Sequence, residues 1–142
     1  MKLFGAMFVF CVTIAMATSA LATEPVRVGS KVFTESVILG ELATQLGNLA
    51  GVPTIHRSQL GGTRVLWDAL LAGQIDIYPE YTGTAFTNVL KQPLISDQAI
   101  VLERVRNEYA TLQLDWLDPL GFNNAFAMAV RGADAGSAIS RP

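Results

Sequence analysis

The sequence of 142 residues has little of what several classes of protein require. It holds one cysteine and one histidine, which argues against a disulfide framework and against a zinc site. Ten basic and twelve acidic residues give a net charge of −2, so we expect no basic face for nucleic acid. Long Pro, Gly or Ser tracts, charge blocks and internal repeats are absent, so neither disorder nor a repeat array is expected. The length suits one domain of ordinary size.

The first 22 residues have the pattern of an export signal. Lys2 supplies a positive charge, residues 3–17 form an uncharged apolar run, and Ala20-Leu21-Ala22 has the small-x-small pattern of a cleavage site. The run is short for a membrane-spanning helix, so a membrane anchor is the less favoured alternative. Cys11 lies inside the run and would be removed with it. We therefore expect an exported, periplasmic or extracytoplasmic protein that begins at Thr23 and needs no disulfide.

The rest of the chain alternates strand and helix patterns. Apolar residues in alternation or in short runs predict strands, and apolar residues at helical spacing predict helices. Strands are expected at residues 26–29, 54–59, 75–78, 114–117 and 125–130, and helices from Thr34 to before Gly51, from Thr63 to before Gly73, and from Ser96 to Leu112. Thr34 and Ser96 are the expected capping residues. This order predicts an α/β fold with a mostly parallel, doubly wound sheet that binds ligand at the carboxyl ends of its strands.

Evidence for catalysis in this sequence is poor. His56 lies in an expected strand, and no nucleophile or second ligand is spaced to act with it, so a packed or surface histidine is favoured. Asp76 and Glu80 lie four residues apart at a strand end, but nothing there predicts a raised pKa. Solvated or capping carboxylates are therefore favoured over an acid–base pair. We expect no enzyme activity, no metal and no cofactor.

Two segments are compatible with ligand binding and also with ordinary turns. Residues 60–63 (Leu-Gly-Gly-Thr) place backbone N–H groups at a helix N-terminus, where an anion can bind, but two glycines also permit a tight turn, which is favoured. Residues 78–84 (Tyr-Pro-Glu-Tyr-Thr-Gly-Thr) offer aromatic and hydroxyl groups just past a strand. An aromatic site for a cation and a packed turn are equally compatible with this second segment.

Four motifs, taken together in this order and spacing, resemble those of the glycine betaine, choline and carnitine-binding proteins of ABC importers. The motifs are residues 29–36 (GSKVFTES), 60–63 (LGGT), 73–84 (GQIDIYPEYTGT) and 120–124 (LGFNN), and the resemblance extends from Val26 to Arg131. It implies a type II periplasmic-binding-protein lobe in residues 23–124, with ligand held in a cleft between two lobes. The implied partners are a quaternary ammonium ligand and the permease and ATPase subunits of an ABC importer.

The resemblance also implies which residues bind the ligand. Tyr81 would belong to an aromatic box, since a trimethylammonium group has no N–H donor and is attracted by aromatic faces. Lys31 and Thr84 would face the carboxylate or hydroxyl end of the ligand, and Asn124 is carried over with the last motif. Phe126 stands where relatives often have tyrosine. Phenylalanine keeps the aromatic face but lacks the hydroxyl, so one polar contact is lost.

Three other aromatic residues are expected to pack inside the protein. Tyr78 precedes the implied box residue and is expected to pack, while Trp67 and Trp116 lie on apolar segments typical of a core.

The proteins that this chain resembles are about twice as long. Residues 125–142 would form a crossover strand, with an uncovered edge, and a truncated tail toward a second lobe that is missing. One or two cation–π contacts and a partly exposed Lys31 contact give roughly 2–5 kcal/mol before ordering costs, which corresponds to roughly millimolar binding or weaker. Two functions remain open: a binding component of an osmoprotectant importer, or a truncated, non-transporting remnant of one.

Overall fold

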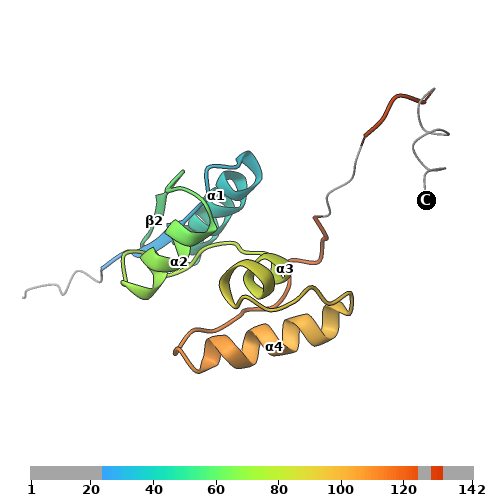
Figure 1. Cartoon of the computed structure of the whole chain (residues 1–142). Coiled ribbons are helices and arrows are strands. Elements are labelled where there is room, and N and C mark those ends of the chain that lie inside the picture. The colour runs from blue at the N-terminus through green and yellow to red at the C-terminus, as the bar shows by residue number, and fades with distance from the viewer. Residues whose placement is uncertain (1–23, 125–128, 133–142) are drawn as a thin grey trace, which may run out of the picture.

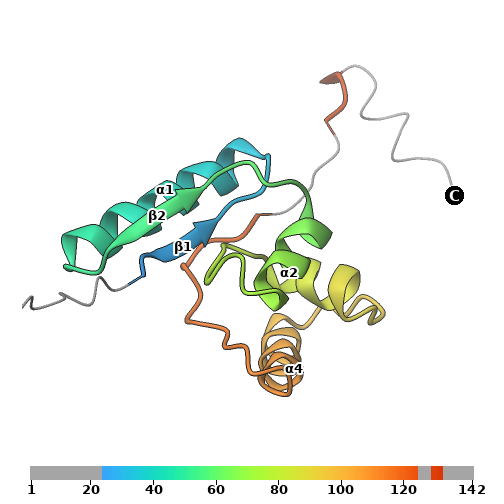
Figure 2. The ribbon, with the colours of Figure 1, turned by 90° about the vertical axis from the view of Figure 1, so that its left-hand side faces the viewer.

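The computed structural model describes residues 24–124 and 129–132 (Figure 1). The elements in chain order are β1 (Val26–Gly29), α1 (Thr34–Leu49), β2 (Thr54–Arg57), α2 (Thr63–Leu71), α3 (Thr82–Thr84), the π-helix η1 (Ala85–Val89) and α4 (Gln98–Ala110). The first four elements form a mixed α/β part, and α3, η1 and α4 form a helical part beside it (Figures 1 and 2). In the part of the chain that the structure describes, no helix is long and apolar enough to cross a membrane.

The sheet is small and parallel, as its first strands predict. β1 pairs with β2 from Val26 opposite Thr54 to Gly29 opposite Arg57. The expected third strand at 75–78 is reduced to one parallel bridge between Val28 and Ile77. The N–H groups of two successive residues, Asp76 and Ile77, both point to the carbonyl of Arg27, so the ladder is irregular where it begins. Pro79 has no N–H to extend it.

Helices α1 and α2 lie against opposite faces of the sheet. Side chains alternate between faces along a strand, and His56 of β2 points to α1. It comes so close to Gly40 that a Cβ there would lie 2.5 Å from His56 Nε2. On the other face, Gly29 of β1 lies against Leu66 of α2. Helix α1 runs along the strands in Figure 2.

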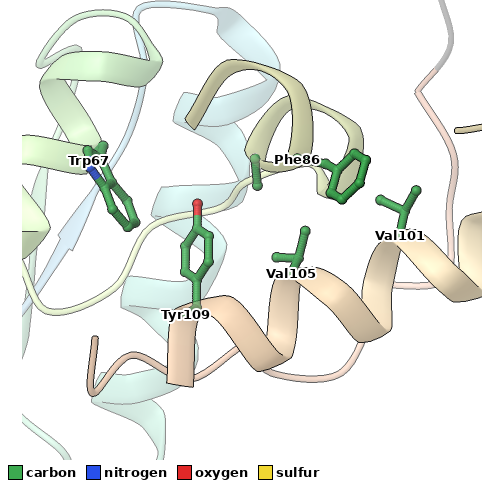
Figure 3. Close-up of a cluster of buried hydrophobic side chains, with 6 residues drawn as sticks. Trp67, Phe86, Val101, Val105 and Tyr109 are labelled. Atoms are coloured by element: carbon green, nitrogen blue, oxygen red, sulfur yellow. The ribbon is translucent and has the colours of Figure 1, made fainter. Parts of the chain in front are cut away.

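A second core joins α2 to the helical part. Its buried side chains come from α2, η1 and α4 and include those in Figure 3: Trp67, Phe86, Val101, Val105 and Tyr109. Val101, Val105 and Tyr109 are four residues apart and therefore lie on one face of α4. The apolar Ile100 and Leu112, near the two ends of the expected helix, are 41% and 46% exposed, so the buried face of α4 is narrow.

Several local expectations are wrong. Asp97, not Ser96, caps α4, because its carboxylate accepts hydrogen bonds from the N–H groups of residues 99 and 100. Phe33, not Thr34, occupies the N-cap position of α1, with no side-chain cap. The helical turns at 82–89 were not expected.

Residues 114–117 form no strand, since Leu114 and Trp116 pack against the helical core instead of lying beside a strand. The sheet of the described residues therefore has two strands and one bridge, fewer than the doubly wound sheet that the sequence predicts. Of the expected strand at 125–130, residues 125–128 lie outside the described residues, and 129–130 are not in a strand.

Candidate functional site: the carboxyl end of the parallel pair

The site is built on a constant offset of 49 residues between β1 and the segment that follows Gly73. Val28 bridges Ile77, and the same parallel offset places Arg27 opposite Asp76 and Lys31 opposite Glu80. In a parallel pair, this offset is kept along both segments. Two basic residues four apart therefore meet two acidic residues four apart, one pair in the ladder and one just beyond its carboxyl end.

The first of these ion pairs is partly exposed. Arg27 Nη2 lies 2.7 Å from Asp76 Oδ1, and the backbone N–H of Arg27 donates to Asp76 Oδ2 at 2.7 Å. The side-chain and backbone hydrogen bonds from Arg27 lower the pKa of the Asp76 carboxyl below its usual value. This pair fits the solvated carboxylate that the sequence predicts for Asp76.

The second ion pair is buried, so Glu80 corrects the expectation of a solvated or capping carboxylate. Lys31 Nζ lies 2.5 Å from Glu80 Oε1, and the two side chains are only 6% and 4% exposed. Glu80 Oε1 also accepts the backbone N–H of Tyr81 at 2.8 Å. The other carboxylate oxygen, Oε2, has no hydrogen-bond partner among the described residues. The structure therefore directs the Lys31 ammonium to Glu80.

The buried Tyr109 and the partly buried Tyr78 both lie near the same carboxylate. The pKa values of the Tyr78 and Tyr109 hydroxyls are raised far above the usual range, mainly by burial and next by the negative charge of Glu80. Within the described part of the chain, neither hydroxyl has a hydrogen-bond partner. Tyr78 packs against the buried cluster of α2, as expected for a residue that packs.

Tyr81, Glu35 and Asn124 meet at the carboxyl end of β1, although they lie far apart in the sequence. The amide of Asn124 donates to Glu35 Oε2 at 2.7 Å. Burial raises the pKa of the Tyr81 hydroxyl, Glu35 raises it further, and Asn124 lowers it. Glu35 and Asn124 therefore both shift the pKa of this hydroxyl, although neither makes a hydrogen bond of good geometry with it. Tyr81 and Asn124 are two of the five expected ligand residues.

The remaining expected ligand residues are placed as follows. Thr84 lies one turn after Tyr81, and the carbonyl of Tyr81 accepts the N–H of Ala85 at 2.9 Å. Thr84 is half-buried on the same short segment as Tyr81. Phe126 lies outside the described residues. The structure thus brings together Tyr81 and Asn124, keeps Thr84 on the next turn, and buries Lys31 beneath them in its ion pair.

An apolar groove of about 630 Å³ lies between α1 and residues 113–120. Its walls include Leu39, Leu42 and Leu46 of α1, and its polar atoms include those of Tyr78 and Glu80. The volume is within the range of small-molecule sites. Tyr78 and Glu80 line both this groove and the candidate site, whereas none of the four expected ligand residues in the described part of the chain lines the groove.

The two tryptophans belong to the core, as predicted. The Trp67 and Tyr109 rings meet edge to face with centroids 4.9 Å apart, and Trp116 meets Tyr109 on its other side at 5.5 Å. Edge-to-face packing of this kind stabilises aromatic clusters. Trp67 is buried in this cluster, and Trp116 is partly buried against it.

His56 takes part in a relay that resembles a hydrolytic triad in its order of contacts. Its Nε2 lies 2.9 Å from Ser30 Oγ, and its Nδ1 lies 3.1 Å from Glu41 Oε2. Ser30 is 0% exposed, and its hydroxyl also accepts the N–H of Gln59 at 3.3 Å. A substrate cannot reach such a buried oxygen, so the relay links β1, β2 and α1 structurally. In the residues that the structure describes, no group of three His, Cys, Asp or Glu side chains could hold a metal.

Sequence analysis missed the roles of Glu80 and Glu35. The paired spacing of Arg27 and Lys31 with Asp76 and Glu80 could have revealed the ion pairs once the parallel register was assumed. Glu35 lies in the first turn of α1, where an acidic residue is already explained by the favourable charge at a helix N-terminus. Its contact with Asn124, 89 residues away, leaves no local signal.

Comparison with known proteins agrees with this architecture. Residues 24–140 match the family described as the substrate-binding domain of ABC-type glycine betaine transport systems. The chain belongs to this family. The family consists of substrate-binding proteins and not enzymes, which confirms both the resemblance and the expectation that the chain is not an enzyme.

Individual relatives are longer than this chain. The glycine betaine-binding protein YehZ of Escherichia coli K12 is 37% identical over 120 residues, which cover 82% of this chain and 39% of YehZ. The ergothioneine transport permease/ergothioneine binding protein EgtU of Helicobacter pylori is 36% identical over 119 residues, or 82% of this chain and 21% of EgtU. The chain thus spans two-fifths or less of these two relatives.

Solved structures show the same part-length similarity. The apo YehZ structure from Escherichia coli superposes with a TM-score of 0.57, covering 61% of this chain and 32% of that one. A crystal structure of a glycine betaine/carnitine/choline ABC transporter protein gives a TM-score of 0.56 at 19% identity, which supports the fold alone.

Proposed function

We propose that this protein is an exported, periplasmic binding component that presents a quaternary ammonium osmoprotectant to an ABC importer. Its described part would be a lobe of type II periplasmic-binding-protein fold, and its partners would be the permease and ATPase subunits. The observation that carries the proposal is the proximity of Tyr81 and Asn124 at the carboxyl end of the parallel pair, with Thr84 on the next turn, in a chain of the glycine betaine family.

The chemistry of this site suits glycine betaine, choline or carnitine. A trimethylammonium group would lie on the half-buried ring of Tyr81, where a cation–π contact contributes about 0.5–2 kcal/mol. Thr84 would bind a polar group at the other end, and Phe126 would add an aromatic face. Ergothioneine, which the name of the relative EgtU includes, is also a betaine and belongs in the same test. Lys31 is the weakest of the proposed contacts, since Glu80 already binds its ammonium group.

The small number of aromatic contacts at the proposed site favours a second candidate function. One or two cation–π contacts contribute at most about 4 kcal/mol, and binding of about −4 kcal/mol corresponds to only millimolar affinity. The alternative is therefore a non-transporting remnant of such a binding protein.

Calorimetric titration of residues 23–142 with glycine betaine, choline, carnitine and ergothioneine tests both candidates. Tyr81→Ala is the site variant, and Trp116→Phe is a control at a core aromatic. Micromolar binding that Tyr81→Ala abolishes would support the transport component. A folded chain that binds none of the four ligands would support the remnant.

A further inference from the structure

The contact between Glu35 and Asn124 joins two segments that the proposed site needs. Glu35 stands in the first turn of α1, within the same motif (residues 29–36) that carries Lys31. Asn124 ends the last motif, and its amide donates to Glu35 Oε2 at 2.7 Å. A charge-assisted hydrogen bond of this length is stronger than one between neutral groups. Residues 120–124 are otherwise exposed, so this bond ties an exposed segment to the α/β part.

The same carboxylate faces the hydroxyl of Tyr81. Among the groups that shift the pKa of this hydroxyl, Glu35 and Glu80 raise it and Asn124 lowers it. Glu80 is bound to Lys31 and to the backbone N–H of Tyr81, so these two contacts hold its carboxylate in place. Glu35 is the exposed carboxylate of the two, and it reaches both Tyr81 and Asn124.

We propose that Glu35 is a positioning residue of the ligand site, whose carboxylate holds Asn124 beside the Tyr81 hydroxyl. This inference rests on the proposed function only in assuming that the ligand lies on the Tyr81 ring. The Glu35 carboxylate lies beside the edge of that ring that carries the hydroxyl, and it adds a negative charge beside a site for a cation. Removing its charge weakens its hydrogen bond with Asn124 and the binding of a cationic ligand.

The first test uses the ligand-free protein, purified after expression of the complete chain. Glu35→Gln is compared with Glu41→Gln, which removes the same charge from α1 where it contacts Gln45 and His56 instead. Nuclear magnetic resonance at neutral pH follows the Asn124 side-chain amide and the Tyr81 ring. We expect Glu35→Gln to shift both signals and Glu41→Gln to shift neither. An unmoved Tyr81 ring in Glu35→Gln would overturn the proposal.

The pH titration of Tyr81 provides a signature that a merely structural role would not give. Tyr81→Phe identifies its step among those of the three tyrosines, because only that step disappears in this variant. Glu35→Gln should lower the pKa of Tyr81, because a neighbouring negative charge is lost. Asn124→Ala should raise this pKa, because the amide that lowers it is lost. Shifts in the same direction in both variants would contradict the proposed arrangement.

Binding then separates this inference from the proposed function. With glycine betaine as the probe, we expect Glu35→Gln to weaken affinity by about two- to fivefold, the effect of one exposed charged contact. If Tyr81→Ala binds as well as the unchanged protein, the proposed site is wrong, and the ligand-free signals still decide the role of Glu35. If Tyr81→Ala loses binding and Glu35→Gln keeps it in full, the inference alone is wrong.

Discussion

Replacing Lys31 by Met tests whether its ion pair with Glu80 is structural. The pair is 2.5 Å long, and its side chains are 6% and 4% exposed, so the carboxylate left behind cannot be solvated. One of its oxygens already has no hydrogen-bond partner among the described residues. Removing one member of a buried pair costs about 3–5 kcal/mol of unfolding free energy. That is a large fraction of the stability of a domain of this size.

Urea denaturation followed by tryptophan fluorescence measures this loss. Arg27→Met is the matched control, because Arg27 meets Asp76 at the same chain offset but with side chains 32% and 39% exposed. We expect it to cost about 0.2–1 kcal/mol. The double variant Lys31→Met/Glu80→Gln should recover most of the lost stability, since no unpaired charge then remains buried. Equal losses in Lys31→Met and Arg27→Met would refute the reasoning.

The double variant also tests the ligand role implied for Lys31. If the lysine only neutralises Glu80, a folded Lys31→Met/Glu80→Gln protein should bind glycine betaine as the unchanged protein does. Loss of binding in this folded variant would instead support direct contact between Lys31 and the ligand.

Three further changes probe the α/β part. Arg27 lowers the pKa of Asp76 in the folded protein below its value in the unfolded chain. The stability from this pair is therefore present above the unfolded-state pKa and is lost as the pH falls through the folded-state pKa. Urea midpoints of Asp76→Asn should vary less with acid pH than those of the unchanged protein. Ser30→Ala leaves His56 Nε2 without its partner and should cost about 1–3 kcal/mol, while an unchanged midpoint would contradict the relay. Gly40→Ala places a Cβ 2.5 Å from His56 Nε2, so thermal unfolding should show a lower Tm, with about 1–3 kcal/mol lost to overpacking.

Most of the α/β elements could be predicted from sequence, because their signals are local. The alternation in β1, the helical spacing in α1 and α4, and the glycine after α2 each depend on a few neighbouring residues. Gly73 adopts a positive φ of 63°, which ends α2 as expected. The strand prediction at 114–117 is wrong because contacts remote in the sequence decide the structure there. Its apolar residues fit a strand or a packed loop equally well, and the nearby helical core decided between them.

The candidate site also contains residues that local sequence predicts and contacts that it does not. The motif at residues 78–84 pointed to Tyr81 and Thr84, because aromatic and hydroxyl side chains after a strand are typical of ligand sites. The binding of Lys31 by Glu80 becomes visible only once the parallel register is known, and the contact of Glu35 with Asn124 leaves no local signal. These partners are 49 and 89 residues apart.

The sequence by itself determined the family, the parallel order of the first strands and the residue types available for a cation. Ordered motifs and short-range periodicity are properties of the chain that exist before it folds. Only the tertiary structure decided which charges are buried, which are exposed and which face Tyr81. Burial and charge pairing depend on distances between segments remote in the chain, and those distances are set by the strand register and by the packing of α1 and α2 on the two faces of the sheet.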